Sequence, residues 1–130
     1  MNVPIDSVVP MLKANDLQET IRFYTTYLGF TVGSVAGPEG KPDWCSLQRD
    51  KVCLMFYGMD APKGPPNMTG VLYFYPKDVR ALWDQLKDKA PVEWELCEMD
   101  YGMLEFAIRD CNGCTLSFGQ DIDEVPPVPH

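Results

Sequence analysis

The sequence predicts an α+β fold in which two tandem βαβββ units form one curved, eight-stranded mixed sheet with both helices outside. The chain has 130 residues, which suits one compact domain and excludes two unrelated ones. The order strand, helix and three strands occurs twice in its hydrophobic pattern. A shift of 62 residues, the difference between positions 16 and 78, superposes Asp16 on Asp78 and Val9 on Val71. The chain is therefore expected to be a repeat of architecture more than of sequence.

The first repeat contains one helix, expected over residues 17–28. Asp16 is the expected N-cap, Glu19 stands three residues later as in a capping box, and Gly29 suits a left-handed residue at the helix end. The apolar side chains of this helix recur on one stripe, formed by Leu17, Ile21, Tyr24 and Leu28. The strands of this repeat are expected at residues 7–12, 30–35, 44–48 and 52–57.

The second repeat follows a linker at residues 58–67, which holds three prolines and two glycines and cannot continue a sheet. Asp78 is the expected cap of its helix. The apolar face of that helix consists of Val79, Leu82, Trp83 and Leu86. Its strands are expected at residues 70–75, 92–97, 103–109 and 114–119.

These elements predict one domain over residues 1–120, made of two repeats at about 5–57 and 68–120. Residues 121–130 are expected to form a flexible, acidic, proline-containing tail. Period-2 alternation assigns the strand residues to two faces. The face under the helices is expected to hold Val8, Leu12, Leu54, Phe56, Leu72, Phe74, Leu116 and Phe118. The other face is expected to hold Val9, Met11, Cys53, Met55, Tyr57, Val71, Tyr73, Tyr75, Thr115 and Ser117.

Composition excludes several classes of function. Eleven basic against nineteen acidic residues give a net charge of -8, which disfavours nucleic acid and anionic lipid as partners. No apolar run reaches the roughly 20 residues that span a bilayer. The only histidine is His130, so a catalytic histidine or a histidine metal cluster is not expected.

The five cysteines predict a reduced, cytoplasmic protein, because their number is odd and the N-terminus does not resemble a secretory signal. Cys111 and Cys114 form a C-x-x-C pattern, but Asn112-Gly113 is typical of a tight turn between strands. Two turn cysteines are therefore favoured over a redox or zinc site.

Two stretches resemble a known family. Residues 12–24 (LKANDLQETIRFY) with 27–30 (YLGF) resemble the first βα segment of the vicinal oxygen chelate superfamily, also called the glyoxalase/bleomycin-resistance/dioxygenase superfamily. Residues 99–118 (MDYGMLEFAIRDCNGCTLSF) resemble the closing hairpin of its metal-free bleomycin-resistance branch. The resemblance covers nearly all of residues 7–120 and implies the glyoxalase/bleomycin-resistance fold, with two chains completing each cavity of a homodimer.

The resemblance also implies where a metal would bind. Metal-dependent members carry His, Gln or Glu at inward positions of the first, fourth, fifth and eighth strands. The matching positions here are Val9, Met55, Val71 and Ser117. Such side chains do not hold a hard divalent ion, so no metal, other cofactor or catalytic residue is expected.

The expected ligand site is an aromatic and thioether surface formed by Trp44, Met55, Tyr57, Tyr73 and Tyr75, with Ser117 and Met11 beside it. Rings and thioethers stack on planar or cationic molecules. Acids on the same walls, such as Glu105 or Asp43, would favour a positive ligand. The alternative is that these side chains are plain core or dimer interface, and Trp94 fits either core or cavity rim. Glu105 and Arg109 are expected to form a solvated or cross-strand ion pair.

Three hypotheses about function follow. The first is a metal-free protein that sequesters a planar, cationic ligand in an aromatic-lined cavity at a dimer interface. The second is a lyase, epimerase or dioxygenase of the same superfamily that uses a metal the sequence does not reveal. The third is a stress or scaffold protein whose cavity is filled by its own side chains.

Overall fold

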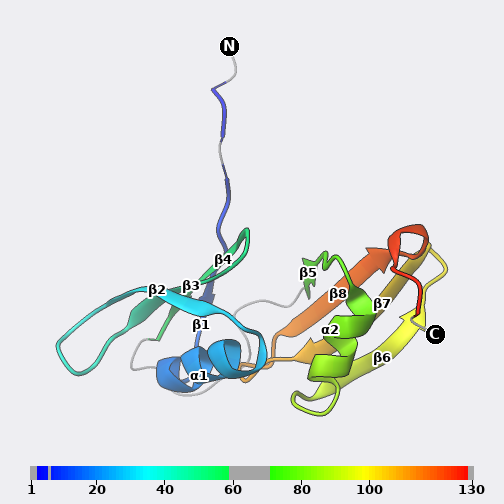
Figure 1. Ribbon diagram of the computed structural model, residues 1–130. Helices are drawn as coiled ribbons and strands as arrows, with labels where there is room; N and C mark the ends of the chain where they lie inside the picture. The colour runs from blue at the N-terminus through cyan, green and yellow to red at the C-terminus, as the bar shows by residue number, and fades with distance from the viewer. Residues whose placement is uncertain (1–2, 6, 59–70, 129–130) are drawn as a thin grey trace. The chain divides into compact units, whose positions relative to one another are not determined.

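The computed structural model describes residues 3–5, 7–58 and 71–128 (Figure 1). The chain divides into two compact units, residues 1–64 and 65–130, and each is considered by itself. Of the predicted linker at residues 58–67, only Gly58 lies within the described part. That both repeats make up a single domain stays a prediction.

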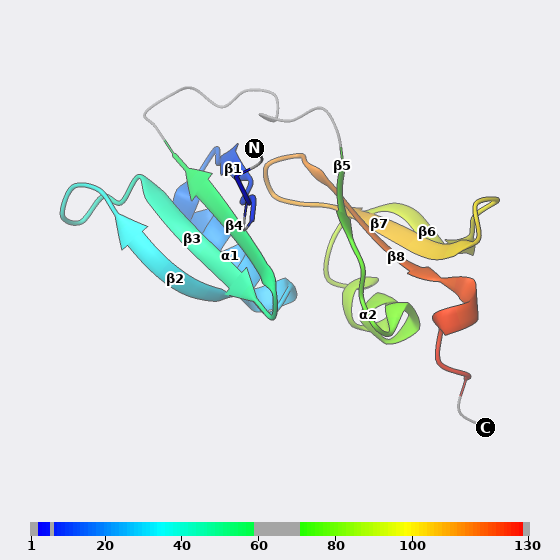
Figure 2. The ribbon, with the colours of Figure 1, turned by 90° about the horizontal axis from the view of Figure 1, so that it is seen from above.

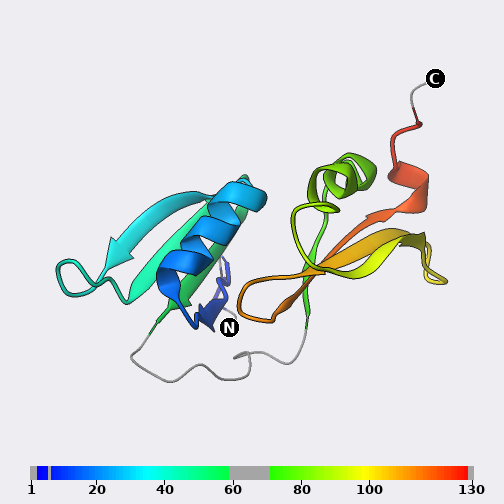
Figure 3. The same cartoon turned by 90° about the horizontal axis from the view of Figure 1, so that it is seen from below.

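The first unit has the predicted order of strand, helix and three strands. Its elements are β1 (Met11–Lys13), α1 (Leu17–Tyr27), β2 (Thr31–Ala36), β3 (Trp44–Arg49) and β4 (Val52–Tyr57). The strands form one sheet in the order β1-β4-β3-β2, in which β1 runs parallel to β4 and the other pairs are antiparallel. The strands lie in front of α1 from above (Figure 2) and behind it from below (Figure 3), so the helix covers one face of this sheet.

The second unit repeats this architecture. Its elements are β5 (Val71–Phe74), α2 (Val79–Leu86), β6 (Val92–Glu98), β7 (Met103–Arg109), β8 (Thr115–Asp121) and the 3-10 turn η1 (Ile122–Glu124). The strand order β5-β8-β7-β6 is the same, with β5 parallel to β8. The predicted fold class, two tandem βαβββ units, is confirmed, and its eight strands are divided between two hydrogen-bonded sheets of four.

Helix α1 begins at the predicted residue and ends at Tyr27, one residue before the predicted end. The Asp16 side chain accepts a hydrogen bond from the Glu19 amide at 3.0 Å, and Gly29 has a φ of 68°, the left-handed conformation that glycine adopts most easily. Tyr24 is fully buried and packs on Phe30 and Phe56, with ring centroids 5.4 and 5.0 Å away. The helix is therefore fixed to its sheet mainly by aromatic packing.

Helix α2 is capped as predicted. The Asp78 side chain accepts from the Ala81 amide at 3.1 Å. Val79, Leu82 and Leu86 are buried, while Trp83 is half-buried with its ring 5.2 Å from that of Phe106.

The predicted alternation of faces holds for most strands. The helix sides carry the buried side chains of Leu12, Leu54, Phe56, Leu116 and Phe118. The prediction is wrong for Val8, which is 90% exposed. β1 is only three residues long, because its parallel pairing with β4 begins at Met11, so the expected strand at residues 7–12 starts four residues late.

The predicted tail also starts with regular structure. β8 continues to Asp121, and the turn η1 follows, with the Asp121 side chain accepting from the Asp123 amide at 2.9 Å. The Ile122 amide donates to the Gly102 carbonyl at 3.0 Å. These hydrogen bonds hold residues 121–124 against the rest of the second unit.

The five cysteines, all within the described ranges, are not joined in disulfides, and Cys111 and Cys114 lie at the turn between β7 and β8. Asp110 accepts from the amides of Asn112 and Cys114 at 2.9 and 2.8 Å, and Gly113 has a φ of 83°. Burial, together with the nearby Asp110, raises the pKa of Cys114 to about 11. A thiol of this kind is a poor nucleophile, so the turn interpretation fits the structure better than a redox site.

Neither helix among the described residues is long and apolar enough to cross a membrane.

Candidate functional site

The face of the second sheet that points away from α2 gathers polar and aromatic side chains; we call it the Glu105 face. Register places Tyr73 beside Ser117 and Glu105 beside Gly119, with Ala107 opposite both Ser117 and Trp94. Phe106, Leu116 and Phe118 alternate with these residues and therefore point to α2. The Glu105 face is therefore the more polar face of this sheet, and the face toward α2 is apolar.

Its centre is a buried carboxylate that accepts three hydrogen bonds. Glu105, on β7, is 2% exposed. Its Oε1 accepts from the hydroxyls of Tyr73 at 2.8 Å and Tyr101 at 2.6 Å, and its Oε2 accepts from the Trp94 indole nitrogen at 3.1 Å. The three donors come from β5, from the turn before β7 and from β6. We call these four residues the Glu105 cluster.

The expected solvated or cross-strand ion pair is confirmed for Arg109 and wrong for Glu105. Arg109, on β7, pairs with Glu93 on the neighbouring β6 through two hydrogen bonds of 2.8 and 2.9 Å. The pairing of β6 with β7 shifts register twice, between Val92 and Trp94 and again between Trp94 and Cys97. These irregularities change which β6 side chains meet β7, a result that strict alternation does not give.

The carboxylate of Glu105 is held by uncharged donors. None of the ion pairs within the described residues includes it. Burial of a carboxylate is costly unless hydrogen bonds replace the water that it loses, and here two phenols and one indole do so. The result is a fixed negative group in a sheet surface, without a paired cation in the described part of the chain.

The same contacts change the phenols. The hydrogen bond to Glu105, followed by burial, raises the pKa of Tyr101 to about 12. Burial, followed by the hydrogen bond to Glu105, raises the pKa of Tyr73 well above its usual range. Both hydroxyls therefore keep their protons, and so remain donors, throughout the neutral pH range.

Gly119 makes room for this arrangement. It lies opposite Glu105 on β8, and the Tyr73 hydroxyl occupies the space that a side chain at position 119 would need. Even the smallest side chain there would collide with the phenol ring. The glycine therefore allows Tyr73 to lie flat across β8 and reach Glu105.

Ser117 lies on the same face, beside Tyr73. It is 1% exposed, and among the described residues its hydroxyl is the buried side-chain group without a hydrogen-bond partner. Most buried polar groups in proteins are partnered, so such a hydroxyl needs an explanation. Ser117 and Glu105 are diagonal neighbours on adjacent antiparallel strands. General sheet geometry separates the Cα atoms of such neighbours by about 7–8 Å.

A groove of about 610 Å³ adjoins the cluster at the end of β8. Its walls include Tyr75, Met103 and Gly119, so it reaches the strand position opposite Glu105. The remaining lining residues are Pro76, Lys77, Gln120, Asp121 and Glu124. The volume is typical of small-molecule sites. The ring of Tyr75 is 77% exposed and lies 5.0 Å from that of Tyr73.

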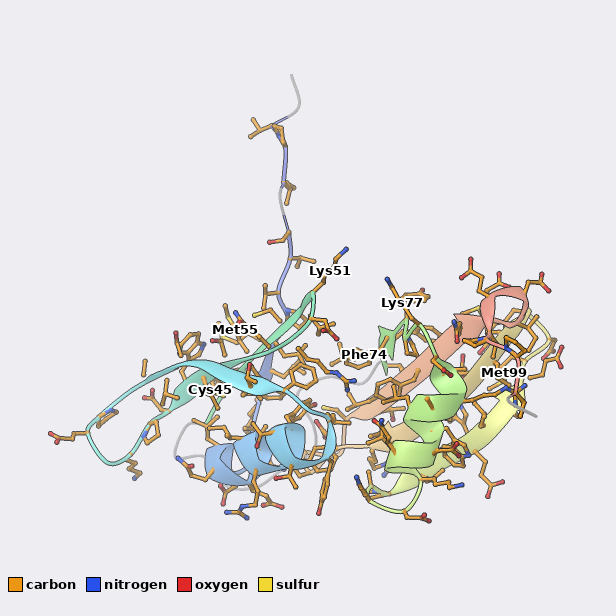
Figure 4. All side chains as sticks on the ribbon, viewed as in Figure 1. Cys45, Lys51, Met55, Phe74, Lys77 and Met99 are labelled. Carbon is orange, nitrogen blue, oxygen red and sulfur yellow. The ribbon has the colours of Figure 1, made fainter. Side chains whose placement is uncertain are left out.

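The other predicted site residues belong to the first unit. Trp44, Met55 and Tyr57 are half-buried and share the face of the first sheet that points away from α1. In Figure 4, Cys45 lies between the strands and α1, and Met55 lies on the opposite side of the strands. The structure therefore brings the predicted residues together in two groups, Trp44, Met55 and Tyr57 in one unit and Tyr73, Tyr75 and Ser117 in the other. A shared cavity stays a prediction.

The four positions at which the superfamily's metal enzymes hold their ion do not fit a metal in this chain. Val9 and Val71 carry no donor atom, Met55 offers only a thioether, and Ser117 offers a hydroxyl. Within the described ranges, no three His, Cys, Asp or Glu side chains are grouped to hold an ion. No chemical step is therefore derived through a metal.

Sequence reasoning missed Tyr101 and the buried state of Glu105. One signal was available: Glu105 stands inside an apolar run, between Leu104 and Phe106. An acidic residue inside such a strand requires donors nearby, and Tyr101 is only four residues away.

The sequence and the fold were compared with those of known proteins. The model of the Glyoxalase/Bleomycin resistance protein/Dioxygenase superfamily matches residues 5–118. A search of curated proteins found no match.

Several solved structures share the fold. The structure of TioX from Micromonospora sp. ML1 has a TM-score of 0.76 at 15% identity, covering 89% of this chain and 98% of that one. A glyoxalase/bleomycin resistance protein/dioxygenase from Nocardioides has a TM-score of 0.73 at 15% identity, covering 99% and 92%. TnmS3, described as an antibiotic binding protein from Streptomyces sp. CB03234, has a TM-score of 0.70 at 16% identity, covering 92% and 99%.

Proposed function

Because the chain belongs to the glyoxalase/bleomycin resistance protein/dioxygenase superfamily, we propose that it is a small-molecule-binding protein of the bleomycin-resistance type. It binds a planar organic molecule against the aromatic surface around Tyr73 and Tyr75 and sequesters that molecule without changing it. The fold alone does not select this function, because one fold hosts many activities. The function therefore has to be inferred from the side chains of the site.

The observation that carries the proposal is the Glu105 cluster beside the groove. A binding site needs an apolar, concave surface with a few fixed polar groups that orient the ligand. Tyr75 and Met103 supply ring and thioether surface in the groove, and Glu105 supplies a polar group that three hydrogen bonds hold in place. Holding a group in its bound geometry lowers the entropic cost of binding.

Sequestration agrees better than catalysis with the residues present. The superfamily's enzymes depend on an ion, and the matching positions Val9, Met55, Val71 and Ser117 do not fit one. TnmS3, described as an antibiotic binding protein, has the same fold, which supports a binding role. The proposal includes a homodimer in which Trp44, Met55 and Tyr57 supply a second aromatic wall to each site.

The proposal is tested by titrating the purified chain with planar aromatic drugs, neutral and cationic, while tryptophan fluorescence is recorded. We expect saturable quenching by at least one of them with one ligand per chain, and size-exclusion chromatography with light scattering should give the mass of two chains. Tyr75→Ala should weaken binding about three- to tenfold, because it removes a stacking surface.

Tyr27→Ala is the matched control, because Tyr27 is an exposed tyrosine on α1 of the first unit. It should leave the affinity unchanged. If no drug in the panel quenches fluorescence at high micromolar concentration, the proposed function is wrong.

A further inference from the structure

We propose that the ligand carries a protonated amine, and that this ammonium group is held between the Glu105 carboxylate and the Ser117 hydroxyl. The inference deepens the proposed function and rests on it. It names the chemical class of the ligand and the two side chains that recognise it.

The Glu105 carboxylate has a hydrogen-bond acceptor position that the cluster does not use. The two oxygens of a carboxylate offer about four acceptor positions. In Glu105, Oε1 already accepts from Tyr73 and Tyr101, whereas Oε2 accepts only from Trp94. One position on Oε2 is therefore left, and because the carboxylate only accepts, a ligand must donate to it.

The second step is the hydroxyl of Ser117. It is buried, on the same face and without a partner among the described residues. An unpartnered buried hydroxyl destabilises the fold, and a ligand removes this cost when it completes the hydrogen bond. An ammonium group has three donors, so it can donate to Glu105 and Ser117 together. A neutral alcohol can also contact both, by donating to Glu105 and accepting from Ser117, but it brings no positive charge to the carboxylate.

The third step is charge. The carboxylate of Glu105 has no cationic partner within the described residues, and the adjoining groove adds the acids Asp121 and Glu124 against the single base Lys77. A buried anion attracts a cation more strongly than an exposed one, because water screens it less. Aromatic rings at Tyr73 and Tyr75 add a cation–π attraction at the same place.

Access is through Tyr101. This residue is 63% exposed and lies on the turn between β6 and β7, so its hydroxyl can return to water at little cost. Tyr73 and Trp94 are half-buried, and both are anchored on strands. An entering ligand would therefore displace Tyr101 first and leave the other two donors in place.

The test uses three probes of one shape: 2-(aminomethyl)naphthalene as the ammonium, 2-naphthalenemethanol as the neutral analogue and 2-naphthoate as the anion. Binding to the full chain is followed by isothermal titration and by the indole N–H resonance of Trp94, assigned with Trp94→Phe. The wild-type chain should bind the ammonium about tenfold or more tightly than the alcohol, and the naphthoate most weakly. The Trp94 resonance should shift with the ammonium.

Two variants locate the preference. Glu105→Gln keeps the side-chain volume, and the Tyr73 and Tyr101 hydroxyls can rotate to serve the amide, so it should fold while losing the preference for the ammonium. Ser117→Ala removes only an unpartnered hydroxyl, so folding should be intact, and ammonium binding should weaken about three- to tenfold. Glu93→Gln, at an acid on β6 that pairs with Arg109, is the matched control and should keep the preference.

The outcomes separate the two proposals. If the wild-type chain binds the ammonium and the alcohol equally, if Glu105→Gln keeps the preference, or if Ser117→Ala binds the ammonium as tightly as the wild-type chain, the inference is wrong while the proposed function stands. If none of the three probes binds, both fail.

Discussion

At the scale of single residues, the Glu105 cluster depends on side chains that must fit together. Glu105 interrupts an apolar strand, and three donors replace the water that its carboxylate loses. Removing one donor leaves an oxygen unsatisfied, which costs more than the bond itself contributed. Tyr73 reaches the carboxylate only because position 119 has no side chain.

This dependence predicts the effect of Gly119→Ala. The added methyl group should push the Tyr73 ring away from β8 and break its bond to Glu105, lowering the free energy of unfolding by about 1–3 kcal/mol. Urea unfolding measures the loss. In a near-ultraviolet titration, the phenol that ionises above the usual range in the wild-type chain should ionise nearer to 10 in the variant.

Tyr73→Ala provides the control for this prediction. In its background the methyl group at position 119 meets no phenol, so Gly119→Ala should cost almost nothing there. An equal cost in both backgrounds would mean that the two residues are not coupled.

The raised pKa of these phenols predicts how the free energy of unfolding changes with pH. An unfolded tyrosine ionises near 10, whereas folded Tyr101 keeps its proton to about 12. A raised folded-state pKa stabilises the fold below the unfolded pKa, so this contribution is present up to about pH 10 and is lost as the pH rises toward 12.

At the scale of elements, helix α2 is fixed at its N-terminus twice. Asp78 caps it by accepting from the Ala81 amide. Gln120, on the neighbouring β8, accepts from the Val79 amide at 3.0 Å and donates to the carbonyls of Lys77 at 2.7 Å and Glu124 at 3.1 Å. One buried amide side chain thus joins the strand, the helix and the 3-10 turn.

The two attachments should differ in their contribution to stability. Asp78→Ala should cost about 1 kcal/mol, the usual value for an exposed cap. Gln120→Met has a similar volume but leaves one amide and two carbonyls without their partner, so it should cost about 2–4 kcal/mol. Denaturant unfolding of both variants checks the order.

Asp16→Ala, at the cap of α1, is the matched comparison and should behave like Asp78→Ala. An equal loss for Gln120→Met and Asp78→Ala would show that Gln120 does not join these elements.

Local signals explain which parts of the fold were predictable. Asp16, Gly29 and Asp78 are recognisable because caps and left-handed glycines depend on neighbours within four residues. The short strand β1 was not, because its start depends on pairing with β4, far along the chain. The role of Glu105 was missed for the same reason: two of its donors come from other strands, and β6 is irregular where Trp94 lies.

At the scale of the whole molecule, the strand registers bear out the 62-residue repeat. The parallel pair Met11 and Met55 in the first unit corresponds to Tyr73 and Ser117 in the second, at the same shift. Two residues further along, Tyr57 pairs with Trp44, as Gly119 pairs with Glu105, although Trp44 and Glu105 are 61 residues apart instead of 62.

Equivalent positions therefore carry different chemistry in the two units. The first unit presents two thioethers, an indole and a phenol, and the second presents a carboxylate, a hydroxyl, a phenol and an empty position.

The repeat also bears on metal binding, because the four family ligand positions are related by the same shift: Val9 corresponds to Val71, and Met55 to Ser117. In both repeats the side chains lack the donors that a hard ion needs, so we expect no specific metal site. Elemental analysis of protein purified without chelator should give far less than one divalent ion per chain. Millimolar Mn²⁺, Ni²⁺ or Zn²⁺ should not raise the Tm, whereas an ion bound at about 10 µM would stabilise the fold by about 2.7 kcal/mol at a hundredfold excess. A stoichiometric ion, or a rise in Tm that EDTA reverses, would contradict the metal-free site and favour an enzyme instead.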